Sequence, residues 1–315
     1  MEIQFLGTGA GMPTKMRNTS AIVLNLRAEG EGYWLFDCGE ATQHQLQYTS
    51  IKPGKIDRVF ITHLHGDHLF GLPGFLSSRS FLGGDTPLTI YGPKGIRQWI
   101  HETLRLTETH LTYPLFVKEI EKEGKLDTVG DFTIYTKKLD HVIDSFGFRI
   151  EQKEQLGALL PERVLAAGVP KGPLFRELKE GRDVVLEDGT IVYSKDVTAA
   201  PERGFIVAIC GDTRMTSASI DLAKGADILV HEATFEEGTE DLAKTYGHST
   251  IQEAAIVAKK ANVQYLIATH ISARFQREDL PKLRSSGQKI FSPLYIAHDF
   301  ARYVWQQQQL HYYKR

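Results

Sequence analysis

Short apolar runs recur along the chain, and polar or glycine-containing segments separate them. Runs of this kind, bounded by turn residues, are typical of buried β-strands. They lie at Ile3–Leu6, Ala21–Leu26, Tyr33–Phe36, Arg58–Thr62, Leu88–Tyr91, Phe132–Lys137, Phe205–Cys210, Ile228–Val230 and Gln264–Thr269. Helix-like segments lie among them at Ala41–Tyr48, Gly95–Thr103, Ser217–Ala223 and Thr250–Lys260, and the polar run Gln306–Gln309 is expected to be the solvated face of a last helix. Strands that alternate with helices predict a layered α/β fold.

One stretch, from about Gln152 to Arg182, lacks strand signals and departs from this pattern. Two short helices are expected there, because a proline can begin a helix and a glycine can end it. The last twenty residues of the stretch carry five Lys or Arg against two Glu. We therefore expect one domain over residues 1–315 that contains an inserted segment at residues 152–182. A surface insertion without function is the alternative interpretation.

The composition is that of an ordinary globular protein and excludes several classes. The 315 residues are 42% hydrophobic and 24% charged, with a net charge of −2, 12 His and only 2 Cys. These values exclude global disorder and a scaffold held by disulfides. The chain has no signal-peptide pattern and no apolar run near the roughly 18 residues of a membrane helix. We therefore expect a cytoplasmic protein without a membrane partner, while a local basic patch would suffice to bind nucleic acid.

The strongest chemical signal is the sequence His63-Leu-His65-Gly-Asp67-His68, directly after the apolar run Arg58–Thr62. Imidazole nitrogen and carboxylate oxygen are ligands that suit Zn²⁺, and they favour zinc over manganese. If the strand geometry continues, residues 63 and 65 point to the same side. Asp67 and His68 come from the following turn and can face a second ion. The hexapeptide therefore predicts a metal site.

Ligand-type residues also follow other apolar runs. They are Asp140, His141, Asp212, His231 and His270. In α/β folds, ligands bind where strands end at the edge of a sheet. Any one of these residues could instead be an ordinary buried or capped side chain. Together with the hexapeptide they predict a shared metal centre.

The hexapeptide resembles the His-x-His-x-Asp-His signature of the metallo-β-lactamase superfamily, and further motifs resemble the ribonuclease Z family within it. These motifs are Phe5-Leu-Gly-Thr-Gly9, Pro13-Thr-Lys15-Met-Arg17-Asn18, His231-Glu232-Ala-Thr234 and His248-Ser249-Thr250. They cover essentially the whole chain, in order. The resemblance implies an αββα four-layer sandwich with a dinuclear metal site. It also implies that the segment at residues 152–182 is a flexible arm that grips tRNA.

The resemblance further implies a set of seven ligands for two Zn²⁺ per subunit. They are His63, His65 and His141 for the first ion, Asp67, His68 and His270 for the second, and Asp212 as the bridge between them. The iron-dependent redox branch of the superfamily typically carries Glu where this chain has His65. The resemblance therefore favours hydrolysis over redox chemistry.

By the same resemblance, the activity would be cleavage of the 3′ trailer from precursor tRNA, which leaves a tRNA 3′-hydroxyl and a trailer 5′-phosphate. Asp67 would position the attacking water and accept its proton. His248 is our candidate general acid, because it precedes Ser249–Gln252, a capping-box pattern at a helix N-terminus that would attract phosphate. Glu232 would orient that imidazole and keep it protonated.

Substrate contacts are expected on the loop near the first strand, beside the last ligand and in the arm. The candidate residues are Lys15, Arg17, Asn18 and Arg274 near the site, and Lys171, Arg176 and Lys179 in the arm. A basic arm that meets the RNA backbone would recognise tRNA by shape rather than by sequence. No aromatic stacking platform is evident in the site itself. The resemblance implies a homodimer.

Other functions would keep part of this pattern. A small-molecule phosphodiesterase or an arylsulfatase-like esterase would keep every ligand but would not need the arm or the loop at Lys15–Asn18. A metal-free scaffold in an RNA-processing assembly usually loses ligands. A thiolesterase of the glyoxalase kind shares the hexapeptide but usually lacks the arm.

Overall fold

Two large β-sheets take up most of the apolar runs. The first sheet has the strand order β19-β18-β1-β3-β4-β5-β6-β7. Its strands are β1 (Glu2–Gly7), β3 (Ala21–Asn25), β4 (Tyr33–Phe36), β5 (Ile56–Phe60), β6 (Leu88–Gly92), β7 (Leu115–Glu119), β18 (Arg302–Gln306) and β19 (Gln309–Tyr313). The strands from β4 to β7 are parallel to one another, and the other neighbours are antiparallel.

The second sheet has the order β17-β15-β14-β13-β10-β9-β8. Its strands are β8 (Gly124–Val129), β9 (Phe132–Leu139), β10 (Ser145–Gln152), β13 (Ile206–Ile209), β14 (Ile228–Glu232), β15 (Tyr265–Thr269) and β17 (Leu294–Ile296). Strands β13, β14, β15 and β17 run parallel. Their carboxyl ends therefore lie at one edge of the sheet, where ligand-binding residues gather in α/β folds.

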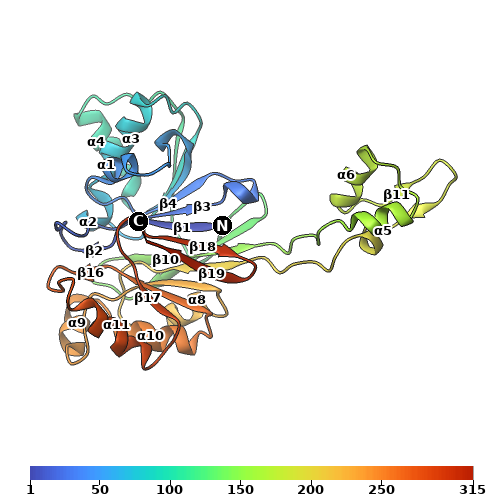
Figure 1. The fold of residues 1–315 in the computed structure, drawn as a ribbon. Helices are drawn as coiled ribbons and strands as arrows, with labels where there is room; N and C mark the ends of the chain where they lie inside the picture. Colours follow the sequence, from blue (N-terminus) through green and yellow to red (C-terminus); the bar gives the residue numbers. More distant parts are fainter. Residues whose placement is uncertain (315) are drawn as a thin grey trace. The chain divides into compact units, whose positions relative to one another are not determined.

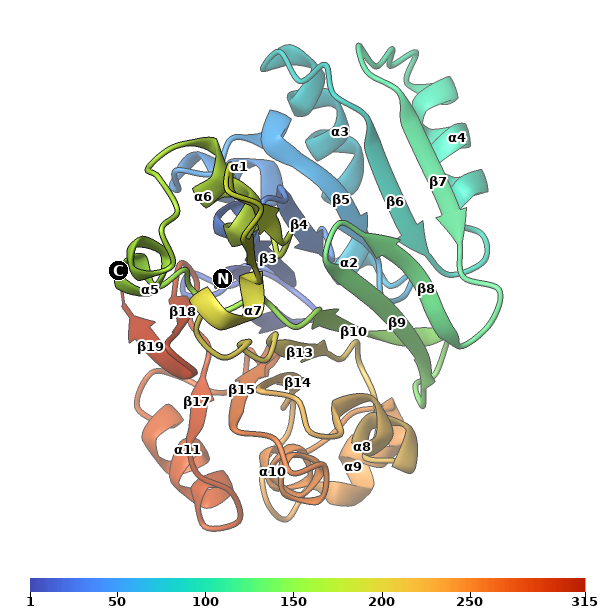
Figure 2. The same cartoon turned by 90° about the vertical axis from the view of Figure 1, so that its right-hand side faces the viewer.

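Helices cover the outer faces of both sheets, and the sheets face each other in between (Figures 1 and 2). Beside the first sheet lie α1 (Thr42–Gln47), α3 (Leu72–Phe81) and α4 (Ile96–Leu106), and beside the second lie α8 (Ser217–Ala223), α10 (Ile251–Lys260) and α11 (Leu280–Gln288). Shorter elements are η1 (Arg27–Glu29), η2 (Pro53–Lys55), α2 (Gly66–Leu69), α9 (Glu240–Tyr246) and the paired strands β2 (Gly9–Ala10) and β16 (Ile271–Ser272). The predicted layered α/β fold is confirmed.

Aromatic side chains from both sheets fill the space between them. Trp34 of β4 contacts Phe60 of β5 and Phe132 of β9, each with ring centroids 5.7 Å apart. Phe148 of β10 contacts Phe60 at 5.2 Å, and Phe36 lies at 6.0 Å from Phe148. All five side chains are almost fully buried. Aromatic burial of this extent is the main source of packing energy in such a core.

The computed structural model describes residues 1–314 and divides into two compact units. The first consists of Met1–Ile150 and the chain from Ile206 onward, and the second is Glu151–Phe205. Within residues 1–314, no helix is both long enough and apolar enough to pass through a lipid bilayer.

The second unit has its own secondary structure and apolar cluster. Its elements are α5 (Pro161–Ala166), α6 (Pro173–Lys179), β11 (Val184–Val185), β12 (Ile191–Val192) and α7 (Ser194–Val197). The two short helices begin at the prolines that predicted them. Val164, Leu178 and Val197 pack together with other buried valines of this unit. The insertion is predicted at residues 152–182, and the compact unit extends further, to Phe205.

The helix predicted at Gln306–Gln309 is wrong. Strands β18 and β19 form an antiparallel hairpin in which Gln306 pairs with Gln309. Gln307 and Gln308 form its two-residue turn, with φ angles of 50° and 57°. Two consecutive residues with positive φ give the tight turn that matches the twist of paired strands. The polar run is therefore a hairpin turn.

Candidate functional site

The predicted ligands of the first unit come together where strands of both sheets end. His63 and His65 follow β5, Asp67 and His68 lie in α2, His141 follows β9, Asp212 follows β13 and His270 follows β15. Five groups of three residues have ligand atoms within 4.8 Å of one another. Three of them consist of predicted ligands alone, and they are His63 with His65 and His141, His63 with His68 and Asp212, and Asp67 with His68 and His270. The other two contain His248, once with His141 and Asp212 and once with Glu232 and His270. The groups share members, so the site is one continuous centre.

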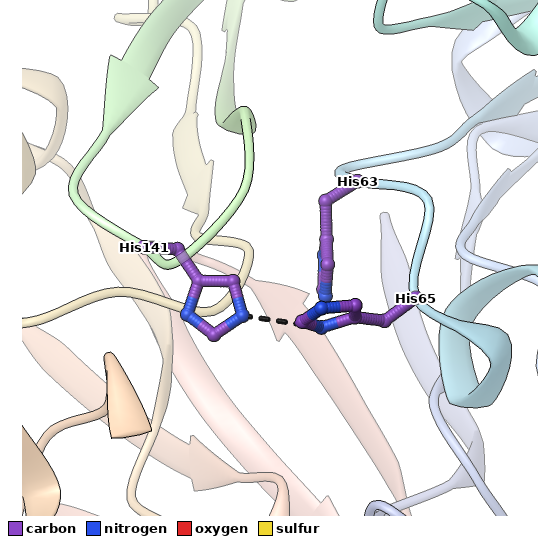
Figure 3. A group of neighbouring side chains, drawn as sticks. All are labelled: His63, His65 and His141. Atoms are coloured by element: carbon purple, nitrogen blue, oxygen red, sulfur yellow. Dashed lines mark hydrogen bonds between the residues drawn. The ribbon is translucent and has the colours of Figure 1, made fainter. Parts of the chain in front are cut away.

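The first group consists of three imidazoles that point toward one another (Figure 3). His141 Nε2 lies 3.2 Å from His65 Nδ1. The Nε2 atom of the buried His63 has no hydrogen-bond partner in the described chain. His141 Nδ1 donates to the carbonyl of Gly247 over 2.7 Å, which leaves its Nε2 free for the centre. A side chain at Gly247 would collide with this ring, since a Cβ would lie 2.7 Å from Nδ1.

The second group surrounds the Asp212 carboxylate. Asp212 Oδ2 lies 3.6 Å from Nε2 of His63, 3.4 Å from Nε2 of His68 and 3.3 Å from Nε2 of His270. Asp67 Oδ2 lies 3.2 Å from His270 Nε2 and accepts a hydrogen bond from the Gly11 amide. Burial opposes ionisation of Asp212, but the imidazoles of His270 and His68 hold its pKa well below the usual range. The carboxylate therefore carries a negative charge in the middle of the cluster.

Asp37 orients two imidazoles from behind the cluster. Its Oδ2 accepts hydrogen bonds from His68 Nδ1 at 2.7 Å and from the Thr62 hydroxyl at 2.9 Å. The Thr62 hydroxyl is therefore free to accept from His63 Nδ1, which lies 2.9 Å away. Both imidazoles thus keep a proton on Nδ1 and present Nε2 to the centre. Asp37 is not among the site residues predicted from the sequence, although it follows the apolar run Tyr33–Phe36.

Glu232 has the equivalent role at the end of β14. Its Oε2 accepts from the Thr234 hydroxyl over 2.8 Å, and that hydroxyl lies 2.8 Å from His270 Nδ1. Its Oε1 lies 3.0 Å from His248 Nδ1. Asp37 and Glu232 therefore act in the same way, since each carboxylate contacts one imidazole directly and a second imidazole through a threonine hydroxyl. His231, which also follows an apolar run and was predicted as a ligand type, donates instead to the Glu232 carbonyl and belongs to none of the five ligand groups.

These donors fit a bound metal. In four imidazoles the outer nitrogen, Nδ1, has an oxygen partner, so the inner nitrogen, Nε2, presents a lone pair to the cluster when the ring is neutral. These imidazoles belong to His63, His68, His141 and His270. Inner nitrogens of this kind face each other at 3.2 Å between His68 and His270. When both imidazoles are neutral, the two lone pairs repel each other, and either a shared proton or a metal ion between them removes the repulsion. Buried imidazole nitrogens next to two carboxylates form a donor set that suits zinc.

We predict that Asp37→Asn weakens metal binding about 10- to 100-fold, which is the usual cost of losing such an orienting partner. An amide nitrogen facing His68 Nδ1 would favour the opposite tautomer, with the proton on Nε2. Asn tolerates the positive φ of 57° at this position, so the backbone is kept. Competition with a chromophoric chelator measures the affinity, and thermal unfolding checks the fold. Unchanged affinity would contradict the orienting role.

His248 lies at the edge of this centre, before helix α10. Burial lowers the tendency of its imidazole to be charged, but Glu232 and then Asp212 raise the pKa of His248 to about 9. The capping box is one residue later than predicted, because Thr250 caps the helix and pairs reciprocally with Glu253. This shift occurs because the Ser249 amide donates to Glu232 and its hydroxyl donates to the Thr213 carbonyl.

A cleft of about 260 Å³ opens beside the ligands and His248. Phe235 and Tyr246 line it, with nearly parallel rings 6.4 Å apart. Arg274 also lines it and lies 5.1 Å above the Phe235 ring. The expectation that the site lacks an aromatic platform is therefore wrong. The position of Phe235 directly after the motif His231–Thr234 is the sequence signal that would have placed an aromatic ring beside the site.

The other predicted contact residues lie in different surroundings. Lys15 is exposed, whereas Arg17 is 4% exposed and donates to the Thr8 hydroxyl and the Ala297 carbonyl. Asn18 donates through its side chain to the Glu40 carbonyl and through its amide to Asp299. These contacts hold the loop that carries Gly11 against Asp67. They leave Lys15 as the accessible cation of the loop.

The three predicted arm residues lie in the second unit and are exposed. Arg176 is paired with Glu180 at 2.8 Å. Lys171 and Lys179 form no ion pair within the part of the chain that the structure describes. The unit as a whole carries eight Lys or Arg and ten Asp or Glu. Any attraction to phosphate must therefore come from local groups rather than from net charge.

Comparison with known proteins adds independent evidence. The model of the family described as "Anti-Pycsar protein Apyc1" matches residues 1–158 and places this half of the chain in that family. A ribonuclease Z from Oceanobacillus iheyensis is 49% identical over 304 residues, which cover 96% of this chain and 99% of that protein. The chain belongs to the ribonuclease Z family. The match decides this, because it spans nearly the full length of both chains.

Solved structures agree with this ribonuclease Z membership. The short form of human tRNase Z has a TM-score of 0.68 and 32% identity, with 96% of this chain and 98% of that chain covered. The metallo-β-lactamase fold protein YhfI from Bacillus subtilis has a TM-score of 0.65 at 21% identity, with 96% and 98% covered, and shows the shared fold. The predicted family, the metallo-β-lactamase fold and the class of enzyme, a phosphodiester hydrolase, are confirmed.

Proposed function

We propose that this ribonuclease Z family member cleaves the 3′ trailer from precursor tRNA with two Zn²⁺ per subunit. The observation that carries the proposal is that overlapping groups of His and Asp ligands lie beside His248 at one cleft. A tRNA 3′-hydroxyl and a trailer 5′-phosphate would be the products. We also propose a cytoplasmic location and, as the family resemblance implies, a homodimer. Sedimentation of the purified protein tests the homodimer.

In this proposal, His63, His65 and His141 hold one zinc ion, and Asp67, His68 and His270 hold the other. Asp212 lies near imidazoles of both groups and would be a ligand shared by the two ions. Two such ions, when bound, lower the pKa of a water and stabilise the charge that develops in an in-line phosphoryl displacement. Asp67 positions the attacking water and accepts its proton. The Gly11 amide, which donates to Asp67 over 2.7 Å, holds this carboxylate in place.

His248 protonates the leaving 3′-oxygen in this mechanism. Its Nδ1 is held by Glu232 at 3.0 Å, so Nε2 is the nitrogen that can donate to the substrate. The buried Glu232 carboxylate stabilises the charged imidazole and fixes the orientation of its ring. His248 lines the same cleft as Asp67 and Asp212, so the proposed acid and the proposed metal ligands can contact one substrate.

The cleft offers partners for the nucleotides around the cut. Arg274 presents a forked cation to a backbone phosphate. Phe235 and Tyr246 provide ring faces on which an unpaired base can stack, as single-stranded RNA ends commonly do. Lys15 contacts the tRNA end from the loop, and the buried Arg17 acts by keeping that loop in place.

The unit Glu151–Phe205, which contains the predicted segment 152–182, is proposed to be the tRNA-binding arm. The double substitution Lys171→Glu and Lys179→Glu is expected to raise the KM for precursor tRNA. It should also reduce the slope of log affinity against log salt concentration by up to about one for each phosphate contact that is lost. Hydrolysis of bis(p-nitrophenyl) phosphate, which needs no arm, should keep its rate. An unaltered KM and salt slope would remove these lysines from the proposal.

The decisive experiment compares metal-stripped and zinc-reloaded protein on a 5′-labelled precursor tRNA with a 3′ trailer. We expect a single zinc-dependent cut beside the discriminator base. Zinc-dependent hydrolysis of a small phosphodiester without any tRNA cut would point instead to a small-molecule phosphodiesterase with the same centre.

A further inference from the structure

A second cavity in the first unit shares no lining residue with the metal cleft. It has a volume of about 390 Å³ and lies between the start of α11, strand β17 and the hairpin of β18 and β19. Three basic side chains, Arg277, Arg284 and Lys314, line it together with Tyr295, Tyr303 and Tyr312. Among the described residues that line it, none is acidic. Nothing in the tRNA cleavage mechanism uses this cavity.

The basic groups of this cavity are available to a ligand. Arg277 and Lys314 make no hydrogen bond or ion pair with any residue in the range 1–314. Arg284 uses only Nε, which donates to the Leu294 carbonyl over 3.1 Å, and its terminal nitrogens remain free. The nearby Asp279 faces a different cavity and accepts from the Gln276 amide. The positive charges are therefore not neutralised by the protein.

The surroundings of His298 support this view of the charge distribution. Burial and then the positive charges of Arg17, Lys314 and Arg277 lower the pKa of His298 to about 4. His298 is therefore neutral near pH 7 and adds no charge of its own. An anion in the cavity would relieve the repulsion between the remaining cations.

The tyrosines give the cavity an aromatic wall. The ring centroids of Tyr303 and Tyr312 are 5.1 Å apart, and Tyr295 lies 5.7 Å from Tyr303. Arg284 lies over the Tyr295 ring at 5.7 Å. The Tyr303 hydroxyl behind this wall is fully buried and has no hydrogen-bond partner among residues 1–314, which is costly for a polar group.

We propose that this cavity is a second binding site, for a nucleoside monophosphate group. Arg277, Arg284 and Lys314 hold the phosphate, and the base lies against Tyr312, which is the most exposed ring of the wall. The volume is within the range of small-ligand pockets and exceeds what a lone phosphate needs. A free nucleotide and a nucleotide within an RNA strand offer the same chemistry. The interpretation with a nucleotide of an RNA strand rests on the proposed function, whereas the interpretation with a free nucleotide does not.

Calorimetric titration of the zinc-loaded protein with adenosine 5′-monophosphate tests the site without any cleavage assay. Inorganic phosphate and adenosine serve as the two half-ligands. We expect AMP to bind at least about tenfold more tightly than either, and Arg277→Gln to weaken AMP at least about tenfold. Lys282→Gln is the matched control. It also removes one positive charge from α11, but Lys282 lines the cavity that Asp279 faces, so AMP binding should stay intact. Tyr312→Leu should erase the preference for AMP over phosphate.

Two results would overturn the proposal: equal AMP affinity in the wild type and Arg277→Gln, or loss of AMP binding in Asp212→Ala, which would place the nucleotide at the metal centre. The KM for precursor tRNA then identifies the source. A KM raised several-fold in Arg277→Gln at constant kcat indicates a nucleotide of the RNA strand. An unchanged KM with lost AMP binding indicates a free nucleotide.

Discussion

Asp212→Ala is expected to reduce the bound zinc to at most one ion and to lower tRNA cleavage at least about 100-fold. The Asp212 carboxylate lies within 3.6 Å of the inner nitrogens of His63, His68 and His270, so its removal leaves three imidazoles without their shared anion. Loss of a partner that only orients a ligand already costs about 10- to 100-fold in metal affinity. A direct ligand shared by both groups must cost at least as much.

Metal analysis after gel filtration, together with circular dichroism, measures this effect separately from activity. Asp140→Asn is the matched control, because Asp140 stands beside the ligand His141 but pairs at the surface with Arg214. This control should keep both ions, since exposed ion pairs contribute little. Two ions per subunit in Asp212→Ala would disprove the bridging assignment, and loss of the folded spectrum would shift the test to Asp212→Asn.

His248→Ala is expected to slow the chemical step about 10²- to 10⁴-fold, the usual contribution of a general acid, while the zinc content stays the same. The side chain lies at the edge of the centre and belongs to the proposed acid pair with Glu232, not to the proposed ligand set. Single-turnover cleavage at saturating enzyme isolates the chemical step from tRNA binding. His101→Ala on the exposed face of α4 removes an imidazole without touching the site.

A substrate with sulfur in place of the leaving 3′-oxygen makes this test specific. A thiolate leaves readily without protonation, so the defect of His248→Ala should largely disappear on the 3′-phosphorothiolate substrate. An equal defect on both substrates would show that His248 positions the phosphate rather than donating a proton. Loss of zinc together with activity would count against the acid role altogether.

Much of the centre could be predicted from the order of residue types along the chain. Apolar runs mark the buried strands, and a polar side chain directly after such a run must leave the sheet at its edge. This rule found His63, His141, Asp212 and His270 across 208 positions of the printed sequence. It works because burial of each strand depends on local composition, whichever neighbours the strand later acquires.

The same local rules failed where a residue's role depends on a distant partner. The sequence pattern of Gln306–Gln309 predicts a helix face, but in the structure β18 and β19 are strands of the first sheet. Arg17 reads as a free cation, yet it is buried against Ala297, which lies 280 residues away. Phe235 and Tyr246 read as ordinary apolar residues until the fold places their rings beside the ligands.

The sequence by itself determined which residues can bind metal and at which strand ends they stand. Only the tertiary structure decided which nitrogen each imidazole presents, because the outer nitrogen is fixed by a partner from another segment. Asp37 fixes His68 across 31 residues, and Gly247 fixes His141 across 106. The directions of these hydrogen bonds depend on how the two sheets and their loops pack together, and no local pattern of residues specifies that packing.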